Sequence, residues 1–142
     1  MKALIRCACS GTQDRNVGTL ILRVYTGAAM MTHGWGKLFG GLDQFTGYVE
    51  SLGLPMPGVL AFLAAFTESF GALFLLLGVK TRIWAALLGV TMFVAVFVAH
   101  ANDPFATREL AVLYLAVSLF FVFKGGGRYS VDWLVKRVTR AE

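Results

Sequence analysis

Four apolar blocks, separated by short polar or glycine- and proline-containing stretches, dominate the pattern of the chain. They cover approximately residues 17–38, 59–78, 83–99 and 110–123. A transmembrane helix needs about 20 predominantly apolar residues, and only a helix or a closed barrel satisfies its backbone groups within lipid. No proline lies inside the blocks. The pattern therefore predicts an all-α protein built as an up-and-down bundle of four transmembrane helices.

The fourth block is too short to span a membrane by itself. Its fourteen residues would give about 21 Å of helix, against about 30 Å of hydrocarbon. We therefore expect this helix to begin before Leu110, which brings Arg108 and Glu109 towards membrane depth.

Two connecting segments have the pattern of short amphipathic helices. In residues 43–52 the apolar side chains Phe45, Val49 and Leu52 share one side. Residues 130–138 combine apolar side chains with basic ones, which predicts a helix at the membrane interface with anionic lipid; a plain polar tail is the alternative. The predicted organisation is a cytoplasmic N-terminal tail (1–16), a four-helix transmembrane domain (17–124) and a cytoplasmic amphipathic C-terminal tail (125–142).

The composition supports a membrane protein. Apolar residues make up 57% of the chain, charged residues 15%, and the mean hydropathy is +0.68, whereas soluble domains carry about 25% charged residues. Such hydrophobicity excludes disorder. The net charge of +5 does not indicate nucleic-acid binding, because the basic residues lie between apolar blocks instead of forming one stripe.

The distribution of basic residues predicts the orientation. With the N-terminus in the cytoplasm, ten Lys and Arg residues lie inside and two, Lys37 and Arg108, lie outside. The positive-inside rule then places both termini in the cytoplasm of a multi-pass protein of the cytoplasmic (inner) membrane. Residues 1–16 lack the apolar core of a cleaved signal peptide. Cys7 and Cys9 have no neighbouring ligands that would complete a metal site, so no metal is expected.

Glu68 is the most informative polar residue, because it lies at the centre of the second block. A charged side chain at that depth costs about 2.5–3.5 kcal/mol. Small residues surround it on its helix face, which predicts that it points into the bundle. A buried carboxyl group requires either a cation or its own proton. Arg23 is the cation we expect, unless its side chain extends to the inner interface instead.

The first predicted helix has one polar face. Arg23, Thr26, His33 and Lys37 fall within an arc of about 80° at about 100° per residue. We expect Arg23, Thr26, Lys37, Glu68 and Tyr114 to form a substrate-binding set in an intramembrane pocket.

A second cluster is expected near the outer ends of the helices. His33, His100 and Glu109 are predicted to converge there and, with Glu68, to form a proton relay. Metal binding is a weaker alternative, since no two of these ligands have i, i+4 spacing on one helix. A further alternative is that His100 merely caps its own helix.

The motifs together resemble the DoxX family of small integral membrane proteins (DoxX/DoxD-like). The resemblance covers about residues 17–132 and is carried by ordered motifs: His33-Gly34-Trp35-Gly36-Lys37, Gly53-Leu54-Pro55-Met56-Pro57, Glu68 with Gly71, Gly78-Val79-Lys80-Thr81-Arg82, His100, Phe105 with Glu109, and the run from Gly125 to Asp132.

The resemblance implies a four-helix inner-membrane protein linked to quinone redox chemistry. Its function would be that of the membrane subunit of a quinone-linked oxidoreductase or redox and detoxification complex. A quinone is then the expected ligand, and a redox-enzyme partner would bring the electron-transferring cofactor. A small proton-coupled carrier, which would need to form a homo-oligomer, and a non-catalytic membrane scaffold are the alternatives.

Overall fold

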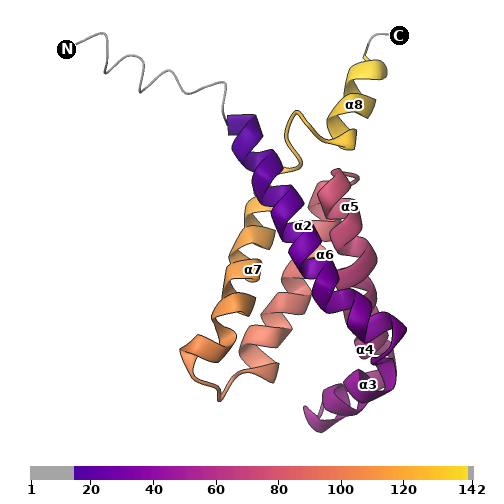
Figure 1. The fold of residues 1–142 in the computed structure, drawn as a ribbon, viewed down its shortest axis with the longest axis vertical. Coiled ribbons are helices and arrows are strands. Elements are labelled where there is room, and N and C mark those ends of the chain that lie inside the picture. Colours follow the sequence, from indigo (N-terminus) through magenta and orange to yellow (C-terminus); the bar gives the residue numbers. More distant parts are fainter. Residues whose placement is uncertain (1–14, 141–142) are drawn as a thin grey trace, which may run out of the picture.

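The computed structural model describes residues 15–140, and all regular structure in this range is helical, as the sequence predicts. Figure 1 shows a long helix, α2, that runs obliquely across the other helices of the bundle. The elements are α2 (Arg15–Phe39), α3 (Leu42–Ser51), α4 (Pro57–Phe66), η1 (Thr67–Gly71), α5 (Ala72–Leu77), α6 (Thr81–Val94), η2 (Ala95–Ala99), α7 (Phe105–Lys124) and α8 (Val131–Val138).

Three helical rods are long and apolar enough to cross a membrane. They are Pro57–Leu77, which joins α4, η1 and α5; Thr81–Ala99, which joins α6 and η2; and α7. The last begins at Phe105, before the apolar block itself, as its length required. α2 has 25 residues, about 37 Å of helix, but its polar residues make it less apolar than the other three.

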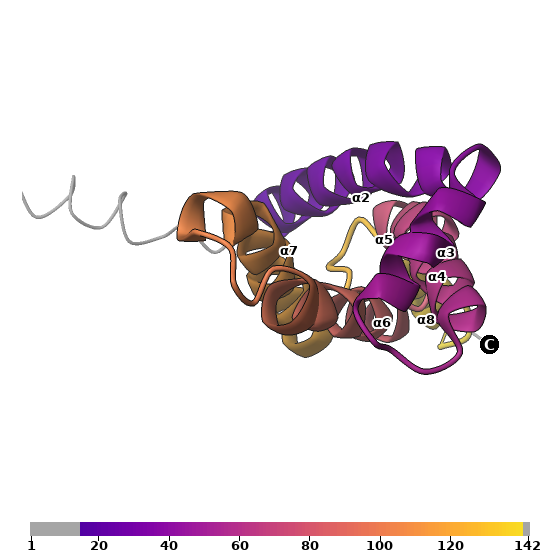
Figure 2. The same cartoon turned by 90° about the horizontal axis from the view of Figure 1, so that it is seen from below.

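The helices surround a small apolar core. α2 packs along the α4–η1–α5 rod, and α7 packs along α6. Figure 2 shows these four rods around a shared interior. α3 and the α6–α7 connection lie at one end of the bundle, and α8 lies at the other end, where α2 begins and the α5–α6 turn lies (Figure 1). The buried residues that fill the interior are Met30, Ala72, Leu75, Ala85, Leu88, Met92, Tyr114 and Phe121.

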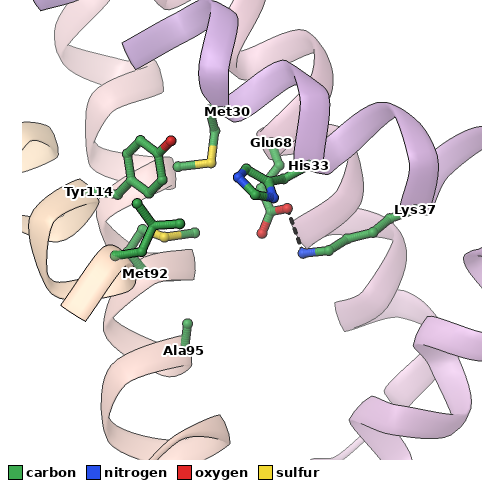
Figure 3. A pocket seen from close by; sticks show the side chains of 8 residues that line it. Met30, His33, Lys37, Glu68, Met92, Ala95 and Tyr114 are labelled. Carbon is green, nitrogen blue, oxygen red and sulfur yellow. Dashed lines mark hydrogen bonds and ion pairs between the residues drawn. The ribbon is translucent and has the colours of Figure 1, made fainter. Parts of the chain in front are cut away.

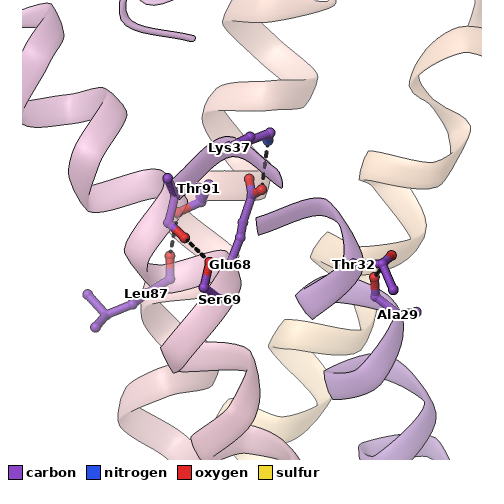
Figure 4. Close-up of polar contacts among 8 residues, drawn as sticks. Ala29, Thr32, Lys37, Glu68, Ser69, Leu87 and Thr91 are labelled. Atoms are coloured by element: carbon purple, nitrogen blue, oxygen red, sulfur yellow. Dashed lines mark hydrogen bonds and ion pairs between the residues drawn. The ribbon is translucent and has the colours of Figure 1, made fainter. Parts of the chain in front are cut away.

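Two of the rods contain a π-helical segment. η1 interrupts the Pro57–Leu77 rod at its middle and carries Glu68, while η2 ends the Thr81–Ala99 rod. Such wide turns are rare and are frequent at functional sites. They also free backbone groups, and here the Ser69 hydroxyl donates to the carbonyl oxygen of Ala65 at 2.7 Å (Figure 4).

The α8 end of the bundle is closed by Arg23. Its side chain is only 2% exposed. Nη1 donates to the carbonyl oxygen of Gly126 at 2.9 Å and Nη2 to that of Tyr129 at 2.7 Å. Gly78 has a positive φ of 75°, and a Cβ at that position would collide with the guanidinium. The buried arginine thus ties α2 to the loop between α7 and α8.

Asp132 attaches the base of α8 to the α5–α6 turn. Its carboxylate accepts hydrogen bonds from the backbone N–H of Lys80 (2.6 Å) and from the N–H and hydroxyl of Thr81 (2.9 and 3.0 Å). Burial acts to raise the pKa of Asp132, but these hydrogen bonds hold it below its ordinary value. The helix predicted in the C-terminal tail is present as α8, and its contact with lipid stays a prediction.

Replacing Arg23 by methionine tests the first of these ties. Arg23→Met keeps the apolar stem but leaves two loop carbonyls without donors, so we expect a loss of about 2–3 kcal/mol and a lower melting temperature in detergent. Arg82→Met is the matched control, because Arg82 is exposed and donates to the Phe123 carbonyl at 3.2 Å; it should change stability by about 0.5 kcal/mol or less. Equal losses of stability in the two variants would show that the hydrogen bonds of Arg23 stabilise the fold no more than the exposed contact of Arg82 does.

Candidate functional site

A pocket lies between α2, η1, the α6–η2 rod and α7, in the half of the bundle nearer α3 (Figure 3). Its volume is about 140 Å³. Polar groups from α2, η1 and α7 face apolar side chains across it. The lining residues are Met30, His33, Lys37, Glu68, Met92, Ala95, Leu110 and Tyr114.

An ion pair between Lys37 and Glu68 forms the polar wall of the pocket. Lys37 Nζ donates to Glu68 Oε2 at 2.6 Å, as Figures 3 and 4 show. The Glu68 side chain is 4% exposed and that of Lys37 is 34% exposed. Lys37 Nζ also lies 4.6 Å from the ring centroid of Phe45 on α3, a cation–π contact. The buried carboxylate is therefore matched by a cation that still reaches the edge of the bundle.

Gly34 allows this pair to form. A Cβ at position 34 would lie 2.5 Å from the backbone N of Ser69 and 2.7 Å from the carbonyl oxygen of Glu68. Only glycine permits the backbones of α2 and η1 to touch in this way. Lys37 follows one turn later on α2, so its ammonium group arrives beside the carboxylate of Glu68.

His33 and Tyr114 face each other across the pocket from α2 and α7. Their rings make an edge-to-face contact, with centroids 6.3 Å apart. Tyr114 is buried, whereas His33 is exposed at the side of the bundle. Met30 and Met92 lie beside them (Figure 3) and supply a soft apolar surface. The pocket thus presents a hydroxyl, an imidazole, an ammonium and a carboxylate group around an apolar slot.

The comparison with known proteins agrees with this picture. The family model described as DoxX matches residues 18–101, and a Bacillus subtilis (strain 168) protein provisionally named oxidoreductase CatD is 31% identical over 117 residues. The chain belongs to the DoxX family. That alignment covers 82% of this chain and 85% of the relative.

A second relative of this DoxX-family chain is an uncharacterised protein of Haemophilus influenzae (strain ATCC 51907 / DSM 11121 / KW20 / Rd). It is 33% identical over 118 residues, with 78% of this chain and 85% of the relative covered. No solved structure matches the chain.

The structure corrects the predicted partner of Glu68. Arg23 does not pair with it, because the Arg23 guanidinium is held by two carbonyl groups at the α8 end of the bundle. Lys37 is the partner instead. Of the predicted substrate-binding residues, Lys37, Glu68 and Tyr114 line the pocket, whereas Arg23 and Thr26 are buried outside its lining.

The structure does not bring His100 and Glu109 into the pocket with His33. His100 Nδ1 lies 2.7 Å from Asp103 Oδ2 within the α6–α7 connection, and Glu109 is exposed. Neither lines the pocket with His33. The reason is local: His100 ends its helix and finds an acceptor three residues later, while Leu110 occupies the position of α7 that faces the pocket. Between residues 15 and 140 no group of three His, Cys, Asp or Glu side chains could hold a metal ion; Cys7 and Cys9 lie outside the described residues.

Several pocket residues could be found only with the structure. Met30, Met92, Ala95 and Leu110 carry no charge that singles them out, and Phe45 was assigned only to the apolar side of a connecting helix. One signal existed in the sequence: Met30, His33 and Lys37 have the i, i+3, i+7 spacing of a single helix face.

Two glycines on α2 provide a matched test of the backbone contact. Gly34→Ala inserts a methyl group against η1, so we expect a loss of about 1–3 kcal/mol from overpacking. Gly36→Ala should be neutral or stabilise the helix by up to about 1 kcal/mol, because no heavy atom lies within 4 Å of a Cβ there. Thermal unfolding in detergent measures both. Equal tolerance of the two substitutions would contradict the close approach of α2 and η1.

Proposed function

We propose that this DoxX-family protein is a four-span protein of the cytoplasmic membrane that binds a quinone as the membrane subunit of a redox complex. α2 would be the fourth span, since it is long enough to cross a membrane and packs along the α4–η1–α5 rod. The excess of basic residues at the α8 end supports cytoplasmic termini. The pocket beside Glu68 would be the quinone site.

The size and lining of the pocket carry this proposal. Its volume of about 140 Å³ is close to that of an engineered protein cavity of about 150 Å³ that admits benzene. A single quinone ring therefore suits the space better than a large ligand does. Met30, Met92 and Leu110 would contact the ring faces and edges, because they form the apolar part of the lining.

The polar groups suit a ligand with carbonyl oxygens. A bound quinone accepts two electrons and two protons. Lys37 and the Tyr114 hydroxyl can donate hydrogen bonds to a carbonyl oxygen, and His33 can do so from either ring nitrogen according to its tautomer. Glu68, whose charge Lys37 compensates while the carboxylate is ionised, can take up a proton from water and pass it to a ring oxygen. The chain would thus orient the ring and handle its protons, and the electrons would come from a partner enzyme.

The name of the Bacillus subtilis relative is consistent with this function. That protein is provisionally named an oxidoreductase, and a role in redox chemistry would transfer to this chain through the shared family. A carrier function would be favoured instead if the purified protein moved a solute across liposomes without binding a quinone.

Quinone binding by the purified protein tests the proposal. Lipid extracts of gently purified protein should contain quinone in near-stoichiometric amount, and a short-chain benzoquinone should bind with saturable affinity. Lys37→Met should weaken binding more than tenfold and Tyr114→Phe by about two- to tenfold, the value of one or two hydrogen bonds.

Tyr25→Phe is the matched control, because Tyr25 is 69% exposed on α2 and does not line the pocket; its affinity should be unchanged. Absence of saturable binding, or equal effects of the two tyrosine variants, would contradict the proposed site.

A further inference from the structure

The polar side of the pocket is directed towards the α3 end of the bundle. Lys37 and Ala95 lie at this end of the pocket, and Tyr114 and Met30 lie deeper (Figure 3). The Glu68 side chain is 4% exposed and that of Lys37, nearer the α3 end, is 34% exposed. His33 and Leu110 are the lining residues that are exposed at the side of the bundle. The ammonium group of Lys37 therefore lies between the buried carboxylate of Glu68 and water at the α3 end.

The opposite direction is closed by apolar packing. Leu75, Leu88 and Phe121 are fully buried and lie between the pocket and the α8 end. Close packing of this kind leaves no room for water. Ser118, on the same side, is 1% exposed and packs against Gly89. The buried polar side chains on this side include Arg23, Thr26 and Ser118. Among the described residues none of these three hydrogen-bonds to Glu68, whose carboxylate accepts from Lys37.

Arg23 cannot bridge the closed layer. Arg23 and Lys37 are fourteen positions apart on α2, which corresponds to about 21 Å of helix. Its two Nη atoms are engaged by the carbonyl oxygens of Gly126 and Tyr129. Arg23 and Lys37 thus serve opposite ends of the bundle, and of these two only Lys37 lines the pocket.

Phe45 lies beside Lys37 at the open end. It belongs to α3, which packs on α4, and its ring lies 4.6 Å from Lys37 Nζ. The ring holds the ammonium group near Glu68 by a cation–π contact. A movement of Phe45 or of Lys37 would widen the opening without disturbing the bundle core.

We propose that the pocket exchanges water and protons with the α3 side of the membrane only, and that Phe45 and Lys37 form its gate. If the pocket binds a quinone, as the proposed function states, any proton that the bound ring gains or loses is exchanged with the α3 side; this consequence rests on the proposed function. The titratable groups facing the pocket are Lys37, Glu68, His33 and Tyr114.

Cysteine accessibility in sealed vesicles tests the proposal. Cys7 and Cys9 are first replaced by serine, and single cysteines are then placed at Ala95, at the open end, and at Ser118, in the closed layer. Gln44→Cys and Lys136→Cys are exposed markers of the α3 and α8 sides. A membrane-impermeant methanethiosulfonate is added from one side or the other.

Ala95→Cys should react from the α3 side only, and Ser118→Cys should not react from either side. Adding Phe45→Ala should speed the Ala95→Cys reaction by about two- to tenfold, the equivalent of one cation–π contact, whereas Phe45→Trp should keep the original rate. Reaction of Ala95→Cys from the α8 side, its failure to react at all, or comparable reaction of Ser118→Cys would overturn the proposal.

The labelling needs no ligand, so the two proposals can fail separately. The expected labelling without any quinone binding would remove the proposed function and leave one-sided access intact. Quinone binding together with labelling from the α8 side would support the proposed function and contradict one-sided access.

Discussion

The burial of one carboxylate near the middle of an apolar bundle constrains the rest of this structure. Glu68 would cost several kcal/mol in the membrane without compensation, and Lys37 provides it at 2.6 Å. For the two to meet, the backbones of α2 and η1 must touch, which requires Gly34. The pocket, its polar wall and its opening all follow from where this pair lies.

Arg23 and Lys37 show how one helix, α2, serves both ends of the bundle. Arg23 is more deeply buried than Lys37, yet among the described residues no carboxylate lies within hydrogen-bond distance of it; backbone carbonyl oxygens accept its hydrogen bonds. A planar guanidinium suits such divergent acceptors. The flexible ammonium group of Lys37 can instead pair with Glu68 and remain in reach of water. Arg23 thus has a structural role and Lys37 is available for chemistry.

Much of the fold could be predicted from the sequence, because apolar block length and amphipathic spacing are local properties. The helical class, the early start of α7 and the helices α3 and α8 are confirmed. Three helices meet the length and hydropathy of a span, and the fourth span stays a prediction, since the polar residues of α2 lower its hydropathy.

The pairing of side chains was harder to predict. Glu68 was identified by its depth alone, and the polar face of α2 correctly contained its partner. To choose Lys37 over Arg23 as the partner, one would need to know the axial position of α2 relative to η1, which the Gly34 contact fixes. One would also need to know that Glu68 lies in a π-helical turn. His100 was misplaced for a similar reason, because its acceptor Asp103 lies in a connection whose shape no periodicity describes.

The central claim, that Lys37 and not Arg23 neutralises Glu68, is tested most directly by paired double-mutant cycles. Melting and unfolding free energies would be compared for Lys37→Met, Arg23→Met and Glu68→Gln, alone and in pairs. We predict a coupling of about 1–3 kcal/mol between positions 37 and 68, with the double variant more stable than Lys37→Met alone. Positions 23 and 68 should be additive within about 0.5 kcal/mol. Additivity at 37 and 68, with coupling at 23 and 68, would contradict the account.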